Sequence, residues 1–328
     1  MNIYDIAREA GVSIATISRV LNNKGTVSPA TRAKVEAVLA RYNYTPSAIA
    51  RGMVSRSMRT VAVLTADIRV PRCARTVYTL EREFRRRGYD TLLCNTGSSR
   101  DETLRALSAV RKKQVDGIVL AGSVFGTLCQ GAEMEKLLTG VPVVLANGRL
   151  TLPTACSVRV DEAYGAALAV EHLVRQGRKN LYYLQEQDTP GAKARWDGFR
   201  AALARAGLES RGHLLHAGET PEESLHAVRQ LLAADPRLDG LLCGGELTAL
   251  GALKALRQAG YCVPGQVAVI ACSDSDYARL SEPALTALDT KPEQMALLCV
   301  QLLESRMAED GACSSVTLQP ELVERETG

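Results

Sequence analysis

The chain has 328 residues, of which 46% are hydrophobic and 23% charged, and its net charge is +4. This length suggests two or three domains and is ample for a buried core. No apolar run approaches the roughly 20 residues of a membrane span, so a membrane-spanning protein is excluded and no membrane partner is expected. Helical sequence begins at Asn2, so we expect no signal peptide and a cytoplasmic location.

The charge is distributed unevenly along the chain. Residues 1–59 contain nine Lys and Arg but three Asp and Glu, which gives this segment a net charge of +6 and leaves −2 for the remainder. A small basic unit at the N-terminus is typical of a part that binds a polyanion.

The cysteines and histidines indicate neither a disulfide framework nor a metal site. The nine cysteines are odd in number and form no C-x-x-C motif, and the four histidines show no ligand spacing. Buried free thiols in a reducing compartment are the simpler interpretation. We therefore expect no metal and no cofactor.

Residues 2–21, NIYDIAREAGVSIATISRVL, predict two short helices joined by a tight corner. Asn2 is a suitable N-cap for the first helix, with Asp5 three residues later. Gly11 tolerates the backbone conformation that ends a helix, and Ser13 is a suitable cap for the second. One face of each helix is apolar and should pack inward, as should Val35 of a third helix that begins at Ser28-Pro29.

The outward face of the second helix has the chemistry of base recognition. Ile14 and Ala15 can contact a thymine methyl group, and Arg19 can donate two hydrogen bonds to guanine. The alternative is a merely solvated basic helix. The residues predicted to bind DNA in this region are Ser13, Ile14, Ala15, Thr16, Ser18, Arg19, Asn22 and Arg32.

Three segments, IYDIAREAGVSIATISRVLN, VSPATRAKV and YTPSAIARGM, resemble the DNA-binding region of the LacI/GalR family of bacterial transcription regulators. The resemblance implies a helix-turn-helix headpiece of three helices at 1–45, a hinge helix and linker at 46–59, and an effector-binding core at 60–328. It also implies a nucleoid-associated homodimer that binds a pseudo-palindromic operator in double-stranded DNA and acts as a repressor controlled by a small-molecule effector.

Residues 46–53, PSAIARGM, are the segment that the resemblance identifies as the hinge helix. A helix this short is unstable alone, so the alternative is a flexible linker. In the family such helices enter the minor groove as a pair. Ala50 then suits close helix packing, Arg51 a phosphate contact, and Met53 the position of the wedge that opens a base step.

From residue 60 onward, short apolar runs alternate with helical stretches, which predicts an α/β core of doubly wound parallel sheets. The resemblance implies a periplasmic-binding-protein-like core of two subdomains, at about 60–160 with 289–318 and at about 161–288 with 319–328. Its three crossings should lie near Val160, Leu288 and Leu318. We predict strands at 61–64, 91–94, 117–120, 143–146, 181–184, 241–243 and 267–270, and helices at 74–88, 101–114, 130–139, 162–176, 192–206, 221–233 and 247–258.

Ligands of open α/β sheets bind beyond the carboxyl ends of the strands, so loops there should line a cleft. Arg195 in RWDGF matches the R-x-x-G-F motif, which the resemblance connects with effector binding. Helix packing is the alternative role for Trp196, and helix capping for Asp161. The predicted effector-binding residues are Arg72, Asn147, Arg149, Asp161, Arg195, Trp196, Glu246, Ser273 and Asp274.

Arg72, Glu246 and Ser273 depart from the family pattern for sugar binding. Three guanidiniums, those of Arg72, Arg149 and Arg195, favour an anionic effector, because the fork of a guanidinium matches carboxylate and phosphate oxygens. The alternative is a degenerate pocket whose own carboxylates neutralise these arginines, so that a protein partner or nothing controls the regulator.

Two further classes of protein fit less well. A solute-binding receptor would not need a basic headpiece. An enzyme is not indicated, because no G-x-S-x-G, P-loop or G-x-G-x-x-G motif stands between a strand and a helix. We expect no catalytic residues.

The hinge interpretation predicts that residues 46–57 are protected from hydrogen exchange only when the operator is bound, because a short helix of small residues cannot hold itself in water. Hydrogen exchange with and without operator measures this. Equal protection in both states would contradict it.

Overall fold

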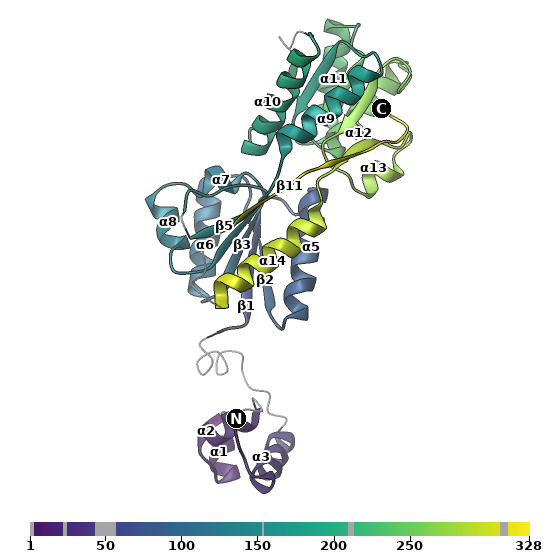
Figure 1. The fold of residues 1–328 in the computed structure, drawn as a ribbon. Coiled ribbons are helices and arrows are strands. Elements are labelled where there is room, and N and C mark those ends of the chain that lie inside the picture. The colour runs from purple at the N-terminus through teal and green to yellow at the C-terminus, as the bar shows by residue number, and fades with distance from the viewer. Residues whose placement is uncertain (1–2, 22–24, 43–56, 153, 209–212, 309–313) are drawn as a thin grey trace. The chain divides into compact units, whose positions relative to one another are not determined.

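The computed structural model describes residues 3–21, 25–42, 57–152, 154–208, 213–308 and 314–328 (Figure 1). The chain forms two compact units, Met1–Met58 and Arg59–Gly328. Each unit is described by itself.

The N-terminal unit contains helices α1 (Ile3–Ala10), α2 (Ile14–Leu21) and α3 (Pro29–Arg41). Ile6, Ile17 and Val35, one from each helix, are fully buried against one another in a small core. Gly11, at the corner, has a φ of 58°. The predicted caps at Ser13 and Ser28 are confirmed: the Ser13 hydroxyl accepts from the Thr16 amide at 3.2 Å, and that of Ser28 from the Thr31 amide at 3.2 Å.

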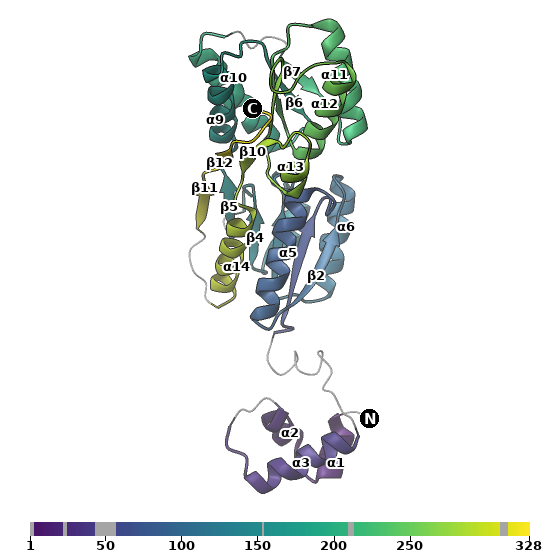
Figure 2. The same cartoon turned by 90° about the vertical axis from the view of Figure 1, so that its right-hand side faces the viewer.

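The second unit begins with a six-stranded parallel sheet that helices cover on both faces. Its strand order is β11 (Ser315–Leu318), β5 (Ala155–Val160), β4 (Val143–Ala146), β3 (Gly117–Ala121), β1 (Thr60–Thr65) and β2 (Asp90–Asn95). Side chains alternate between the faces along β1. Val61 and Val63 pack with α5 (Pro71–Arg86) and α14 (Pro292–Ala308), which lie side by side (Figure 2). Ala62 and Leu64 pack with α6 (Arg100–Lys112), α7 (Phe125–Leu128) and α8 (Ala132–Leu138).

A second six-stranded sheet has the order β12 (Glu321–Val323), β10 (Thr286–Asp289), β9 (Ala268–Ala271), β8 (Gly240–Cys243), β6 (Leu181–Gln185) and β7 (Leu214–His216). Strand β12 pairs antiparallel with β10. Helices α9 (Glu162–Arg175) and α10 (Pro190–Arg205) cover one face. Helices α11 (Pro221–Ala234) and α12 (Glu246–Gln258), with the short α13 (Asp276–Leu280), cover the other.

The chain passes between the two sheets three times. It leaves the first sheet at Val160 and enters α9 at Glu162, returns from β10 to α14 after Asp289, and passes again from β11 to β12 after Leu318. These positions confirm the predicted crossings and the predicted fold class.

Several elements were not predicted as such from the periodicity. The largest is α14, and the others are β5, β7, β10, β11, β12, α7 and α13. The residues of α14 that pack against α5 and strands β3, β4 and β5 form one stripe, but Leu297, Leu298 and Leu302 place further apolar side chains outside it. A helix with apolar residues on several sides gives a weak periodic signal. The other missed elements are short strands and turns, which sequence patterns specify poorly.

No helix among the described ranges has the length and apolar character needed to cross a bilayer.

The close packing of α9 on α10 depends on Gly198. A Cβ atom added there would lie 2.1 Å from the Ala163 carbonyl oxygen, so Gly198→Ala should force the helices apart. We expect a loss of about 1–3 kcal/mol in the free energy of unfolding, measured by urea denaturation.

Gly265→Ala is the matched control, because its new Cβ would meet Cys262 at an ordinary 3.5 Å. We expect that variant to change stability by no more than about 0.5 kcal/mol. Equal effects of the two substitutions would show that the α9–α10 contact is not tight.

Candidate functional site

Helix α2 presents a mixed apolar and cationic surface. Ile17 and Val20 are buried in the core of the headpiece, whereas Ala15 and Arg19 are exposed and Ile14 is 37% exposed. Ser18 and Thr16 are partly exposed on the same helix. The outward face is therefore arranged as the sequence predicted.

Arg19 is the long donor of this face. Its side chain passes beside Gly25, where an added Cβ atom would lie 3.6 Å from Arg19 Cδ. Within the described part of the chain no carboxylate pairs with Arg19. Arg32 of α3, by contrast, has its Nη1 atom 3.9 Å from Glu36 Oε1.

The other predicted DNA-binding residues lie outside the residues that the structure describes. They are Asn22, Ala50, Arg51 and Met53, and the predicted cap Asn2 lies outside as well, so those predictions remain predictions.

A cavity of about 330 Å³ lies between the two subdomains. The first subdomain contributes the loop after β1 and the start of α5, and the second contributes the loops after β6, β7, β8 and β9. The lining residues are Asp67, Arg69, Val70, Pro71, Arg72, Glu186, Gln187, Glu219, Thr220, Pro221, Gly244, Gly245, Glu246, Leu247 and Ser273. The cavity thus occupies the carboxyl ends of the strands, where such folds bind ligands.

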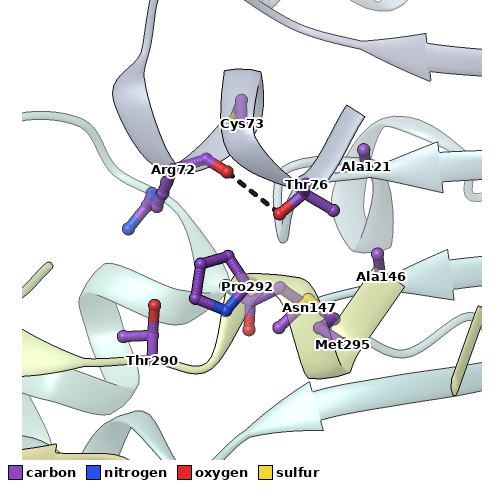
Figure 3. A pocket seen from close by; sticks show the side chains of 10 residues that line it. Arg72, Cys73, Thr76, Ala121, Ala146, Asn147, Thr290, Pro292 and Met295 are labelled. Carbon is purple, nitrogen blue, oxygen red and sulfur yellow. Dashed lines mark hydrogen bonds between the residues drawn. The ribbon is translucent and has the colours of Figure 1, made fainter. Parts of the chain in front are cut away.

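A second, much smaller cavity of about 30 Å³ adjoins Arg72 and is shown in Figure 3. Asn147, Thr290 and Met295 are among its lining residues. The Thr76 hydroxyl donates to the Arg72 carbonyl at 2.9 Å, while the Arg72 side chain extends away from that bond (Figure 3). The space is enough for a water molecule but not for a metabolite.

Glu162 and Arg195 form a buried ion pair beside these cavities. Arg195 Nη1 lies 2.8 Å from Glu162 Oε2, and the two side chains are 3% and 7% exposed. Arg195 Nε donates to the Tyr183 hydroxyl at 3.1 Å. Asn147 Nδ2, at the end of β4, donates to Glu162 Oε1 at 3.0 Å. Because Asn147 belongs to the first subdomain and Glu162 to the second, this network joins the two.

The environment of Glu162 keeps its carboxyl group ionised. Burial alone would raise its pKa, but the charges of Arg195 and Arg72 and the hydrogen bonds from Asn147 and Arg195 outweigh burial and lower the pKa below the ordinary value. Burial also raises the pKa of Tyr183 to about 12, so its hydroxyl stays protonated.

Comparison with known proteins identifies the family. Residues 2–47 match the group described as bacterial regulatory proteins, lacI family, and residues 170–327 match a periplasmic binding protein-like domain. An HTH-type transcriptional regulator of Lachnoclostridium phytofermentans is 30% identical, in an alignment that covers 100% of this chain and 99% of that protein. The chain belongs to the LacI family. The ribose operon repressor of Escherichia coli K12 is 31% identical over 98% of both chains.

Two solved structures extend the LacI-family likeness over the whole chain. A transcriptional regulator CelR–cellobiose complex is 28% identical, covers 100% of both chains and gives a TM-score of 0.74. The lac repressor dimer bound to operator and the anti-inducer ONPF is 23% identical, covers 100% of this chain and 98% of that one, and has a TM-score of 0.90, a likeness of fold. The predicted function, a DNA-binding transcriptional repressor with a core that senses a small molecule, is confirmed.

The prediction that the guanidiniums of Arg72, Arg149 and Arg195 face one cleft of this LacI-family core is wrong. Arg195 is bound by Glu162 and Tyr183, and Arg149 is exposed and lines neither cavity. Arg72 is the one predicted arginine that lines the 330 Å³ cavity. The premise for an anionic effector is therefore lost.

Other predicted effector residues have structural partners. Trp196 stacks on Tyr183 and Phe199 at centroid distances of 6.3 Å and 5.6 Å and lines neither cavity, which agrees with its packing alternative. Asp161 accepts from the Tyr164 amide at 3.0 Å and caps α9.

Asp274 lies on another surface, in a separate cavity of about 510 Å³ beside Arg75 and Glu293. It pairs there with Arg325 at 2.8 Å. Glu246 and Ser273 do line the 330 Å³ cavity, where the serine hydroxyl donates to the glutamate.

Four acidic side chains at this site were not among the predicted effector residues, namely Asp67, Glu162, Glu186 and Glu219. Glu186 directly follows strand β6 and Glu219 lies in the loop after β7, so the rule on strand ends could have found Glu186. Glu162 gives no such signal, because an acidic residue in the first turn of a helix is common for reasons of helix stability alone.

The buried pair predicts a large cost for Glu162→Gln, which leaves the Arg195 charge unpaired. We expect a loss of about 3–5 kcal/mol in the free energy of unfolding, as for one-sided removal of buried pairs. Urea denaturation measures it. The control is Glu171→Gln, whose pair with Arg205 has side chains 52% and 60% exposed, and which should cost no more than about 1 kcal/mol.

The difference between the wild-type chain and Glu162→Gln should also depend on pH. Because folding lowers the pKa of Glu162, its stabilisation is complete above the ordinary value of 4.5 and is lost as the pH falls through the folded value. A difference that stayed constant down to strongly acidic pH would contradict the role of the ionised pair.

Proposed function

We propose that this repressor is a homodimer in which α2 of each subunit reads one half-site of an operator through the major groove. The exposed face of α2, with Ile14, Ala15 and Arg19, is the observation that carries the proposal. Apolar side chains near the start of a helix can contact thymine methyl groups, and an arginine further along can bond guanine. The proposed DNA contacts are Ser13, Ile14, Ala15, Thr16, Ser18, Arg19, Asn22, Arg32, Ala50, Arg51 and Met53.

Charge and symmetry support this arrangement. The net charge of +6 in residues 1–59 matches the phosphates around a half-site. The lac repressor, which has the same fold, was solved as a dimer on its operator. Two-fold symmetry in the protein requires a pseudo-palindromic operator.

We propose that residues 46–59 act as hinge and linker between the headpiece and the core. We also propose that the protein acts in the cytoplasm, on the nucleoid.

The effector site proposed here is the 330 Å³ cavity. Its walls come from both subdomains, so a ligand there contacts both at once and stabilises the closed cleft. A ligand with different affinities for open and closed cores changes operator affinity by that ratio. The CelR relative was solved with cellobiose, which supports a small-molecule effector. We assign no enzymatic activity, since the relatives are transcriptional regulators.

One observation favours the second candidate, a core without an effector. The bond from Asn147 to Glu162 joins the two subdomains through side chains of the chain itself. In that case no metabolite fraction from the source cell would change operator affinity, whereas the effector proposal requires at least one active fraction.

The DNA-reading role predicts that Arg19→Ala weakens operator binding by about 1–3 kcal/mol for each half-site contact and reduces the preference for operator over scrambled DNA. Fluorescence anisotropy with both DNAs measures this. Arg257→Ala, an exposed arginine on α12 in the core unit, makes the same charge change and should have no effect. An unchanged operator-to-scrambled ratio in Arg19→Ala would contradict base reading.

A further inference from the structure

The 330 Å³ cavity has an excess of negative charge. Four carboxylates, those of Asp67, Glu186, Glu219 and Glu246, line it with two guanidiniums, so its formal charge is −2. Asp67 is already paired with one of them, since its two oxygens accept from Arg69 Nε at 3.0 Å and Nη2 at 2.8 Å. Glu186, Glu219 and Glu246 form no ion pair with any residue that the structure describes, although Glu219 lies within electrostatic reach of Arg69.

Arg72 is itself partly neutralised from the other side. Its charge helps to lower the pKa of Glu162, which shows that the two groups lie within electrostatic reach. The Arg72 guanidinium therefore lies in the field of this buried carboxylate as well as in that of the carboxylates of the cavity wall. An anionic ligand would meet more negative than positive charge in this cavity.

Glu246 lacks a partner that a ligand could supply. Its side chain is 2% exposed, and its Oε2 accepts the Ser273 hydroxyl. Its Oε1 accepts no hydrogen bond from any residue that the structure describes. A buried carboxylate oxygen without a donor is costly, so such an atom in a cavity wall indicates a missing donor.

Glu186 lies close to the same helix start. A Cβ atom at Gly245 would lie 2.7 Å from Glu186 Oε1, and the Thr248 hydroxyl donates to that same oxygen. The glycines at 244 and 245 thus leave space that Glu186 occupies, next to Glu246 in the chain. Glu186, from the loop after β6, and Glu246, the first residue of α12, thus both line the cavity near the start of this helix.

Two other features of the cavity bear on the ligand. No aromatic ring is among its lining residues, so it has no stacking platform for a neutral sugar ring. Helices α5, α11 and α12 begin there, and helix starts attract negative charge. Two of these starts have their own carboxylate, since Glu223 caps α11 in a capping box and Glu246 is the first residue of α12, whereas α5 has no acidic residue in its first turn.

We propose, on the basis of the effector role proposed above, that this cavity binds a small hydroxyl-bearing ligand with a protonated amino group, which lies between Glu186 and Glu246. The ammonium donates to Glu246 Oε1 and neutralises the excess carboxylate charge. Hydroxyl groups of the ligand donate to the remaining carboxylate oxygens, including those of Glu219 in the loop before α11, and to the amide oxygen of Gln187 in the loop after β6.

Three sugars with the same ring test the charge preference. D-glucosamine is cationic at mildly acidic pH, D-glucose is neutral and D-glucose 6-phosphate is anionic. With the full-length protein, glucosamine should raise the melting temperature in a concentration-dependent way, and the other two should not. An equal or larger shift with glucose or with the phosphate overturns the proposal, and so does the absence of a shift with glucosamine.

Amide variants locate the binding site. Glu246→Gln and Glu186→Gln keep the size of each side chain and its hydroxyl partner, and each should weaken glucosamine binding about tenfold by calorimetry. Glu222→Gln removes the same charge from an exposed position on α11 outside the cavity and should bind like the wild-type chain. Equal binding by all three variants places the sugar elsewhere and overturns the proposal.

Operator binding separates the ligand class from the effector role. If glucosamine binds through Glu246 but leaves operator affinity unchanged, the ligand class stands and the effector role fails. If another metabolite changes operator affinity through this cavity while glucosamine does not bind, the effector role stands and the amine preference fails.

Discussion

The buried pair of Glu162 and Arg195 is the interaction on which the arrangement of the cleft depends. A guanidinium stays charged at all accessible pH values, so Arg195 at 2% exposure requires a carboxylate within reach. That requirement fixes the start of α9 against α10, where Gly198 allows the backbones to touch. Asn147 then ties the same carboxylate to the end of β4 in the other subdomain. One charge pair thus sets helix packing and subdomain contact together.

The same pair determines where ligand chemistry can occur. Arg195, the arginine of the R-x-x-G-F motif, binds Glu162 and Tyr183 and is not among the residues that line the 330 Å³ cavity. The polar groups that remain in the cavity wall are mostly acceptors, with Glu186 and Glu246 at the start of α12. Because Arg195 is engaged where α9 packs on α10, the cavity should prefer ligands that donate hydrogen bonds over anionic ligands.

Features that depend on residues close together in the sequence could be predicted, whereas features that depend on distant residues could not. The face of α2 and the strands β1, β3 and β4 depend on local periodicity, and they were predicted within a residue or two. Helix α14 was missed because Leu297, Leu298 and Leu302 place apolar side chains outside its buried stripe, which weakens the periodic signal. The partners of Arg195 were missed because Glu162 lies 33 residues away and meets it only when α9 packs on α10. A contact between residues this far apart cannot be predicted from the pattern of a short stretch of sequence.

The two units also differ in the sign of charge that they present, and this difference separates their ligands. The headpiece segment is strongly basic, whereas residues 60–328 have a net charge of −2 and the cavity within them adds its own excess of carboxylates. Phosphates of DNA are attracted by the first field and repelled by the second. Anionic metabolites, which are abundant in any cell, are repelled from the cavity in the same way. A cation or a neutral donor enters the cavity without competing for the DNA-binding surface, so each unit excludes the partner of the other by charge before any specific contact forms.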